Sequence, residues 1–235
     1  MDSFQIIALA LTAAWLALVA IKFRRSTVVL IGGLVMLGGY TGAMIALGKA
    51  SPNVVGLGLP DSWPRTIALA AMWTALMFAY SPIADRLATR WFKKPPTLQS
   101  FRAIQESLAK LVAGIAVAWI LGGFLEELAF RGIVLKSLAV LLGGSPGGPI
   151  ATVPAVLAAA AGAGLIHYYQ GPRAMVIIAQ LSILFGVLFV IGGYNLWTVI
   201  FAHGLYDTIA FIRFARGTSK YSKLDGDAAA TTAGS

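Results

Sequence analysis

The chain has 235 residues, of which 58% are hydrophobic and 11% are charged, and it contains no cysteine. Soluble domains carry about 25% charged residues, so this composition excludes an ordinary soluble globular protein. Without cysteine there is no disulfide framework, thiolate nucleophile or thiolate metal site. The net charge of +9 does not indicate a nucleic acid partner. Most basic residues follow apolar runs, where they orient a membrane protein.

Uninterrupted apolar runs of about 20 residues predict membrane-spanning helices rather than the alternating strands of a barrel. The sequence therefore predicts an all-α fold. We expect a polytopic transmembrane helical bundle with about seven spans, within a range of about six to eight spans. The predicted spans are 5–21, 27–48, 66–83, one within 104–142, 152–169, 174–191 and 196–214. The stretch 104–142 is too long for one straight span, so we expect a tilt, a kink or an interfacial half-helix there.

The chain divides into three parts. Residues 1–103 hold the first spans and a basic loop, 104–215 hold the remaining spans, and 216–235 form a tail that we expect to be disordered. Basic residues begin on one side of the bundle at Lys22, Arg86, Arg173 and Arg213. The positive-inside rule then predicts a multi-pass protein of the cell membrane, with its N-terminus outside and its C-terminus cytoplasmic.

The stretch Phe124–Gly132 places two carboxylates and an arginine inside an apolar region. Glu127 and Arg131 are four residues apart and share a helix face, which predicts an ion pair. Glu126 points about 100° away and has no partner on its own helix. An unpaired carboxylate in an apolar wall suits a general base. The alternative is a charge cluster that only holds two helices together.

Two later spans carry further ionisable side chains. His167 and His203 are the two histidines of the chain, and both lie inside apolar runs. Asp207 follows His203 by four residues and shares its face. Each histidine alone is equally consistent with a packing role. Three spans that each bring ionisable groups to the membrane interior predict convergence on a common cavity.

The residues leave few kinds of chemistry open. Ser137 and Ser182 have no glycine-rich elbow and no base at an informative spacing. One carboxylate and two histidines match a metal site by ligand type, although the chain has no HExxH motif. The other option is a carboxylate base acting on water, with imidazoles that orient the water and stabilise an oxyanion.

Three motifs, in order and spacing, resemble those of the CPBP family. They are Glu126-Glu127-x-x-Phe130-Arg131-Gly132, His167-x-Tyr169-Gln170-Gly171, and Asn195-Leu196-Trp197 leading to His203-x-x-x-Asp207. This family comprises CAAX-type prenyl endopeptidases and bacteriocin-processing or immunity proteins, and its proteases are glutamic intramembrane enzymes. The resemblance covers about residues 107–214, and the first three spans show nothing specific.

The resemblance implies that 104–215 is a catalytic helical core. Glu126 would be the general base that activates water, and His167 would bind and polarise that water. His203 and Asp207 would line the oxyanion side, while Glu127 and Arg131 would support the site. Other motif residues would contribute to a substrate pocket: Phe130, Tyr169, Gln170 and Trp197.

The chain departs from the family pattern at two positions. Ala163 stands where the family usually has phenylalanine, four residues before the histidine of the second motif. Asp207 stands where the third motif often has asparagine, although the aspartate variant also occurs in the family. An ionised aspartate cannot donate to an oxyanion, whereas a protonated one can. We therefore expect Asp207 to orient His203 or to share a proton with it.

The sequence thus predicts an intramembrane endopeptidase of the glutamic type, without metal or cofactor, that hydrolyses a peptide bond of a membrane-tethered or lipidated protein. Its predicted partners are the lipid bilayer and that substrate, and not nucleic acid. Two alternatives remain open: a catalytically silent scaffold or immunity protein with the same fold, and a metal-dependent membrane hydrolase. No residue chooses among prenylated CAAX proteins, bacteriocin precursors and sorting-signal proteins as substrates.

Overall fold

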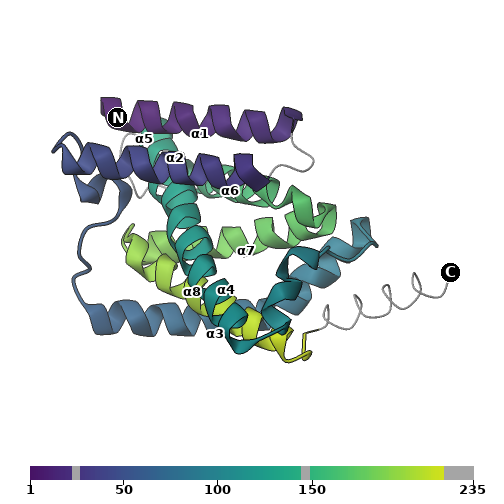
Figure 1. The fold of residues 1–235 in the computed structure, drawn as a ribbon. Coiled ribbons are helices and arrows are strands. Elements are labelled where there is room, and N and C mark those ends of the chain that lie inside the picture. The colour runs from purple at the N-terminus through teal and green to yellow at the C-terminus, as the bar shows by residue number, and fades with distance from the viewer. Residues whose placement is uncertain (23–26, 144–148, 220–235) are drawn as a thin grey trace.

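A computed structural model describes residues 1–22, 27–143 and 149–219 (Figure 1). Helices and turns make up the regular structure of these ranges, which confirms the predicted all-α bundle. Most of the tail predicted to be disordered, residues 220–235, lies outside the described ranges.

Eight α-helices follow one another along the chain. They are α1 (Ser3–Lys22), α2 (Thr27–Ala46), α3 (Trp63–Trp91), α4 (Leu108–Ala118), α5 (Lys136–Gly143), α6 (Pro149–Ile166), α7 (Pro172–Ile191) and α8 (Leu196–Ala215). Two π-helical stretches continue α4 into α5: η3 (Trp119–Glu126) and η4 (Leu128–Leu135). Short 3-10 turns lie at η1 (Pro52–Val55), η2 (Gln99–Gln105) and η5 (Tyr168–Gln170).

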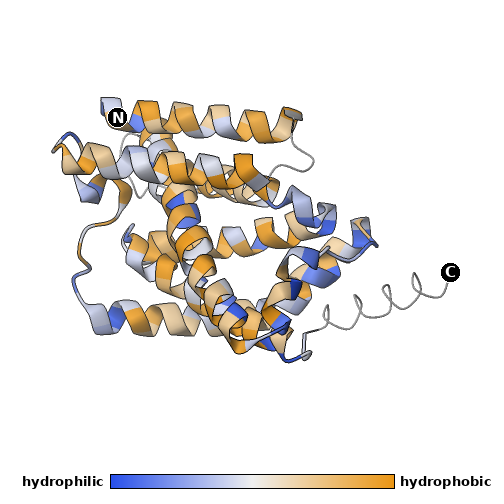
Figure 2. Ribbon diagram, viewed as in Figure 1, coloured by the Kyte–Doolittle hydropathy of each residue, from blue (hydrophilic) through white to orange (hydrophobic). Residues whose placement is uncertain are grey.

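The helices account for the predicted number of spans. Within the described residues, five stretches are long and apolar enough to cross a membrane: Ser3–Ile21, Thr27–Ala46, Trp63–Trp91, Leu108–Gly143 and Pro172–Ile191. The stretch Ile150–Ile166 of α6 is a shorter apolar helix, and α8 has 20 residues. Together they agree with about seven spans. Hydrophobic residues run along most of each helix (Figure 2).

The stretch from α4 to α5 is the longest helix of the bundle. Its 36 residues, Leu108–Gly143, reach about 54 Å at a rise of about 1.5 Å per residue, against a hydrocarbon core of about 30 Å. It is therefore longer than the hydrocarbon core alone requires, and Figure 1 shows it running across α1 and α2 rather than alongside them. The π-helical stretches lie at its centre.

A buried ion pair joins two helices at one end of the bundle. The third span does not end at Ile83 as predicted, because α3 continues to Trp91. Its Asp85 is buried and accepts hydrogen bonds at Oδ1 from Arg173 Nη2 at 2.6 Å and Nε at 2.9 Å. This corrects the predicted bounds of the third span, 66–83. The pair joins the end of α3 to the start of α7 on the side where the basic residues gather.

Helices α1 and α2 pack through a tryptophan that lies over a glycine. Trp15 donates from Nε1 to the carbonyl of Val29 at 3.0 Å, and its side chain is 3% exposed. A Cβ placed on Gly33 would lie 2.1 Å from Trp15 Nε1, whereas a Cβ on Gly32 would meet nothing within 4 Å. The absence of a side chain at Gly33 therefore allows the two helices to approach.

We expect Gly33→Ala to lower the free energy of unfolding by about 1–3 kcal/mol, because the indole must leave its position and its bond to Val29. Thermal unfolding of the purified protein in detergent micelles measures the effect. Gly32→Ala is the matched control and should unfold at the wild-type temperature. Equal midpoints for the two variants would contradict the packing described here.

Candidate active site

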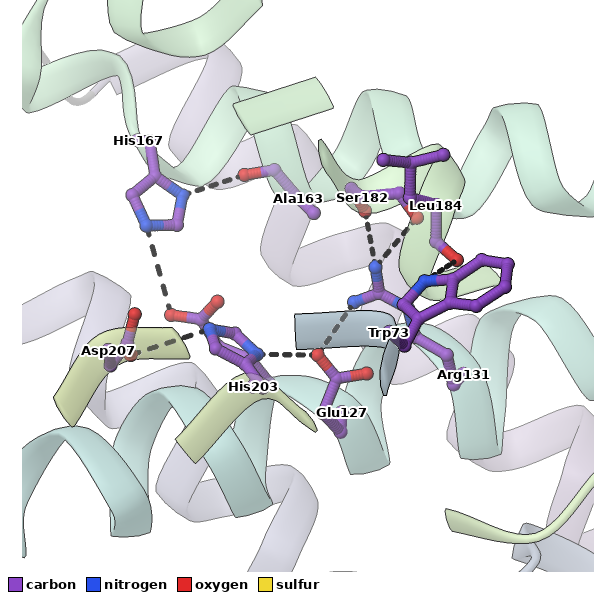
Figure 3. Close-up of polar contacts among 10 residues, drawn as sticks. Trp73, Glu127, Arg131, Ala163, His167, Ser182, Leu184, His203 and Asp207 are labelled. Atoms are coloured by element: carbon purple, nitrogen blue, oxygen red, sulfur yellow. Dashed lines mark hydrogen bonds and ion pairs between the residues drawn. The ribbon is translucent and has the colours of Figure 1, made fainter. Parts of the chain in front are cut away.

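A cavity of about 1500 Å³ lies between the helices, and the ionisable side chains of three elements face it. Glu126 ends the π-helical stretch η3, His167 follows α6, and His203 and Asp207 belong to α8. All four line the cavity wall, as does Arg131 of η4. Figure 3 shows His167 on one side of the space between the helices and His203 and Asp207 on the other. The structure thus brings together the residues of the three motifs.

Glu126 and His167 face each other without a direct hydrogen bond. His167 Nε2 lies 4.0 Å from Glu126 Oε1, and the two side chains are 15% and 14% exposed. The other ring nitrogen, Nδ1, lies 2.8 Å from the carbonyl oxygen of Ala163. A carbonyl can only accept, so Nδ1 carries the hydrogen and Nε2 is directed at Glu126. A gap of this length suits a water molecule that contacts both side chains.

Glu127 is the most enclosed carboxylate of the site, with 0% exposure. Its Oε1 accepts from Arg131 Nη1 at 3.2 Å, which is the predicted pair four residues apart. The same oxygen lies 2.6 Å from His203 Nδ1, a contact that the sequence did not predict. Glu127 therefore links α8 to the continuous helix from α4 to α5, Leu108–Gly143, which we call the central helix.

Arg131 extends this network to α7. Its Nη2 donates to the hydroxyl of Ser182 at 2.7 Å and to the carbonyl of the same residue at 2.8 Å. Its guanidinium also lies over the ring of Phe185, 5.3 Å from the centroid, and Phe185 stacks on His203 at 4.7 Å. Ser182 thus holds the arginine. The sequence analysis did not assign Ser182 or Phe185 of α7 to the site. The available signal was that the two residues are three positions apart, and so share a helix face, in an uncharged span.

His203 has a carboxylate at each ring nitrogen. Glu127 contacts Nδ1, and Asp207 Oδ2 lies 3.5 Å from Nε2. The expected neighbourhood of Asp207 and His203 is present, but the closer partner of the ring is Glu127. Asp207 is therefore free to present its carboxyl group to the cavity, where its side chain is 23% exposed.

The four residues expected to form a substrate pocket separate into two pairs. Tyr169 and Gln170 line the cavity, and Gln170 Nε2 donates to the Tyr169 hydroxyl at 2.8 Å. Phe130 is 0% exposed and packs against Trp15, with ring centroids 6.2 Å apart. Trp197 packs against aromatic side chains of α3 and α8 instead. These two placements correct the pocket prediction, because Phe130 fills the core between α1 and the central helix.

The donor groups do not converge as metal ligands do. In the ranges that the structure describes, no group of three or more His, Asp or Glu side chains is arranged to hold a metal ion. Glu127 already accepts from a guanidinium and an imidazole, and Nδ1 of His167 is engaged by a backbone carbonyl.

The comparison with protein families adds an independent finding. Residues 108–209 match one family model, described as type II CAAX prenyl endopeptidase Rce1-like. This segment is similar to that family. The match confirms the predicted resemblance to the CPBP family and contains Glu126, His167, His203 and Asp207. The apolar helices indicate an integral membrane protein, and residues 108–209 are similar to CAAX-type intramembrane proteases. No curated protein and no solved structure matches the chain.

The buried network makes a prediction about stability. Glu127→Gln leaves the Arg131 guanidinium buried without its carboxylate, and removing one partner of a buried pair costs about 3–5 kcal/mol. We expect a loss of that size in the free energy of unfolding, measured by denaturant titration in mixed micelles.

The double variant Glu127→Gln/Arg131→Gln is the control for this prediction. It removes the orphaned charge as well, so it should be less destabilised than the single Glu127→Gln variant. A double variant that loses as much as the sum of its two single variants would show that the pair is not coupled.

Proposed function

We propose that this protein is a glutamate-dependent intramembrane endopeptidase in which Glu126 activates the attacking water. The observation that supports the proposal best is the pair of Glu126 Oε1 and His167 Nε2, which face each other at 4.0 Å on the wall of the cavity. Because Nδ1 of His167 is engaged by Ala163, the ring is held with Nε2 directed at the carboxylate. A base and an orienting imidazole on either side of one water are suited to hydrolysis.

The reaction follows from this arrangement. Glu126 takes a proton from the water, and the oxygen of the resulting hydroxide bonds to the carbonyl carbon of the peptide. The carbonyl oxygen becomes negatively charged and is stabilised on the side of His203 and Asp207. Glu126 then gives its proton to the nitrogen, the carbon–nitrogen bond breaks, and a carboxylic acid and an amine form; the remaining water proton passes from the acid to the amine, so that a carboxylate and an ammonium group leave.

Glu127 and Arg131 act as positioning residues in this proposal. Glu127 binds Nδ1 of His203 and so fixes the direction of Nε2. Arg131 neutralises the buried carboxylate and is itself held by Ser182. Groups held in place by packing and hydrogen bonds need no reorganisation when charge develops on the substrate.

The cavity supports a membrane-tethered or lipidated protein as the substrate. Its volume of about 1500 Å³ exceeds the range of about 300–1,000 Å³ for small-molecule pockets. Much of its wall is apolar and comes from α2, α4 and α7, including Leu30, Leu34, Val117, Ile177 and Leu181. Such a wall accepts an acyl or prenyl chain, while the carboxylates and imidazoles meet the peptide.

We also propose that the N-terminus is outside and the C-terminus cytoplasmic. Basic residues gather at the end of the bundle formed by the end of α3, the start of α7 and the end of α8: Arg86, Arg90, Lys93, Lys94, Arg173, Arg213 and Arg216. Figure 2 shows hydrophilic residues concentrated at this end. The positive-inside rule supports its placement in the cytoplasm.

The catalytic proposal is tested with Glu126→Gln in proteoliposomes that contain a fluorogenic farnesylated peptide ending in a CAAX sequence. Glutamine cannot accept the proton from water, so we expect cleavage to fall at least about 10²-fold, the lower end of the contribution of a general base. Glu106→Gln changes an exposed glutamate and is the matched control, with expected wild-type activity. Full cleavage by folded Glu126→Gln protein would refute the glutamate mechanism.

The orientation is tested with single cysteines, since the chain has none of its own. Asp61→Cys lies in the α2–α3 connection and Lys94→Cys follows α3, and both positions are exposed. A membrane-impermeant maleimide should label Asp61→Cys in intact cells and Lys94→Cys only after permeabilisation. The reverse pattern would invert the proposed topology.

A further inference from the structure

Gly122 lies on the central helix, next to the polar side-chain atoms of His203 and Asp207 of α8. It belongs to η3, one turn before Glu126, and lines the same cavity. A Cβ built on Gly122 would lie 3.0 Å from Asp207 Oδ2 and 3.3 Å from His203 Nε2. The atoms that a side chain would crowd are therefore the acid and base atoms of the site, and the missing side chain leaves a small space beside them.

The neighbouring glycines show that this space is not a general result of close helix packing. A Cβ on Gly123 would reach the carbonyl oxygen of Ile200 at 3.5 Å and Gly204 at 3.6 Å, which are ordinary contact distances. A Cβ on Gly204 would lie 2.4 Å from the Trp119 ring, so that glycine serves packing. Gly122 differs from both, because it faces the side-chain tips and the cavity.

The contacts of His203 indicate where its ring hydrogen lies. Glu127 Oε1 accepts from Arg131 and lies 2.6 Å from His203 Nδ1, so the tautomer that satisfies this contact carries its hydrogen on Nδ1 and donates it to Glu127. On the other side of the ring, Nε2 and Asp207 Oδ2 lie 3.5 Å apart. If neither His203 Nε2 nor Asp207 Oδ2 carried a hydrogen, their lone pairs would repel each other, and one proton on either atom removes this repulsion. With the proton on Nε2 the pair has an N–H donor beside the cavity, and with the proton on Oδ2 it has an O–H donor there.

We propose that Gly122 shapes the oxyanion site: its missing side chain forms a notch that admits the carbonyl oxygen of the scissile bond to the His203 Nε2–Asp207 Oδ2 edge. A substrate carbonyl group is small and planar, as the notch requires. The proton on the edge then neutralises the charge that develops on that oxygen. Glu126, one turn along the same helix, attacks through water from the adjoining wall.

This inference rests on the proposed endopeptidase function, and it is tested by two adjacent alanines. In Gly122→Ala the methyl group occupies the notch, so we expect kcat on the farnesylated peptide to fall about 10²–10³-fold, as when an oxyanion donor is lost, with KM changed less than about threefold. Gly123→Ala adds the same methyl one residue on and should keep wild-type kcat. Thermal unfolding of the two variants should agree.

Each other outcome decides against part of the scheme. Wild-type kcat in Gly122→Ala, or a loss confined to KM, overturns the assignment of the notch. If Gly122→Ala does not fold, Gly122→Ala/Asp207→Ala decides: recovered folding places the conflict at the Asp207 side chain, as proposed, and continued misfolding assigns Gly122 to helix packing. If the wild type and Glu126→Gln cleave the peptide equally, the proposed glutamate mechanism is wrong, and this result does not depend on the behaviour of the Gly122 variants.

Discussion

The arrangement of the site depends on one buried carboxylate oxygen, Oε1 of Glu127. It receives Arg131 from its own helix and His203 from α8, and Arg131 in turn binds Ser182 of α7. Three elements therefore meet at one fully enclosed charge. An ionised group without partners costs several kcal/mol or more in such a place. The relative positions of these helices are restricted to those that keep all three contacts.

The engagement of Glu127 separates the roles of two adjacent glutamates. Glu127 faces the helix interface, whereas Glu126 faces the cavity and meets His167 across a gap. The backbone here is π-helical, a form that is rare and frequent at functional sites. Neighbouring residues of identical chemistry thus reach different environments: Glu127 is enclosed and paired, whereas Glu126 lines the cavity.

Helical periodicity in the sequence was sufficient for contacts within one helix. It predicted the Glu127–Arg131 pair from a spacing of four, and the rarity of charge in the apolar spans predicted that three spans share a cavity. The bond from Glu127 to His203 joins residues 76 positions apart, and periodicity does not determine which faces of distant helices meet. The same limit explains α3. The charge of Asp85 suggested a loop, while its partner Arg173 lies 88 positions away.

The charges of the site also have to balance, because the surrounding wall is largely apolar. Glu126, Glu127 and Asp207 bring three carboxyl groups, while Arg131 brings one permanent positive charge. A proton retained on the His203–Asp207 edge reduces this excess of negative charge. An aspartate at position 207 therefore keeps a donor beside the notch, because the site retains the proton that an asparagine amide would supply as N–H.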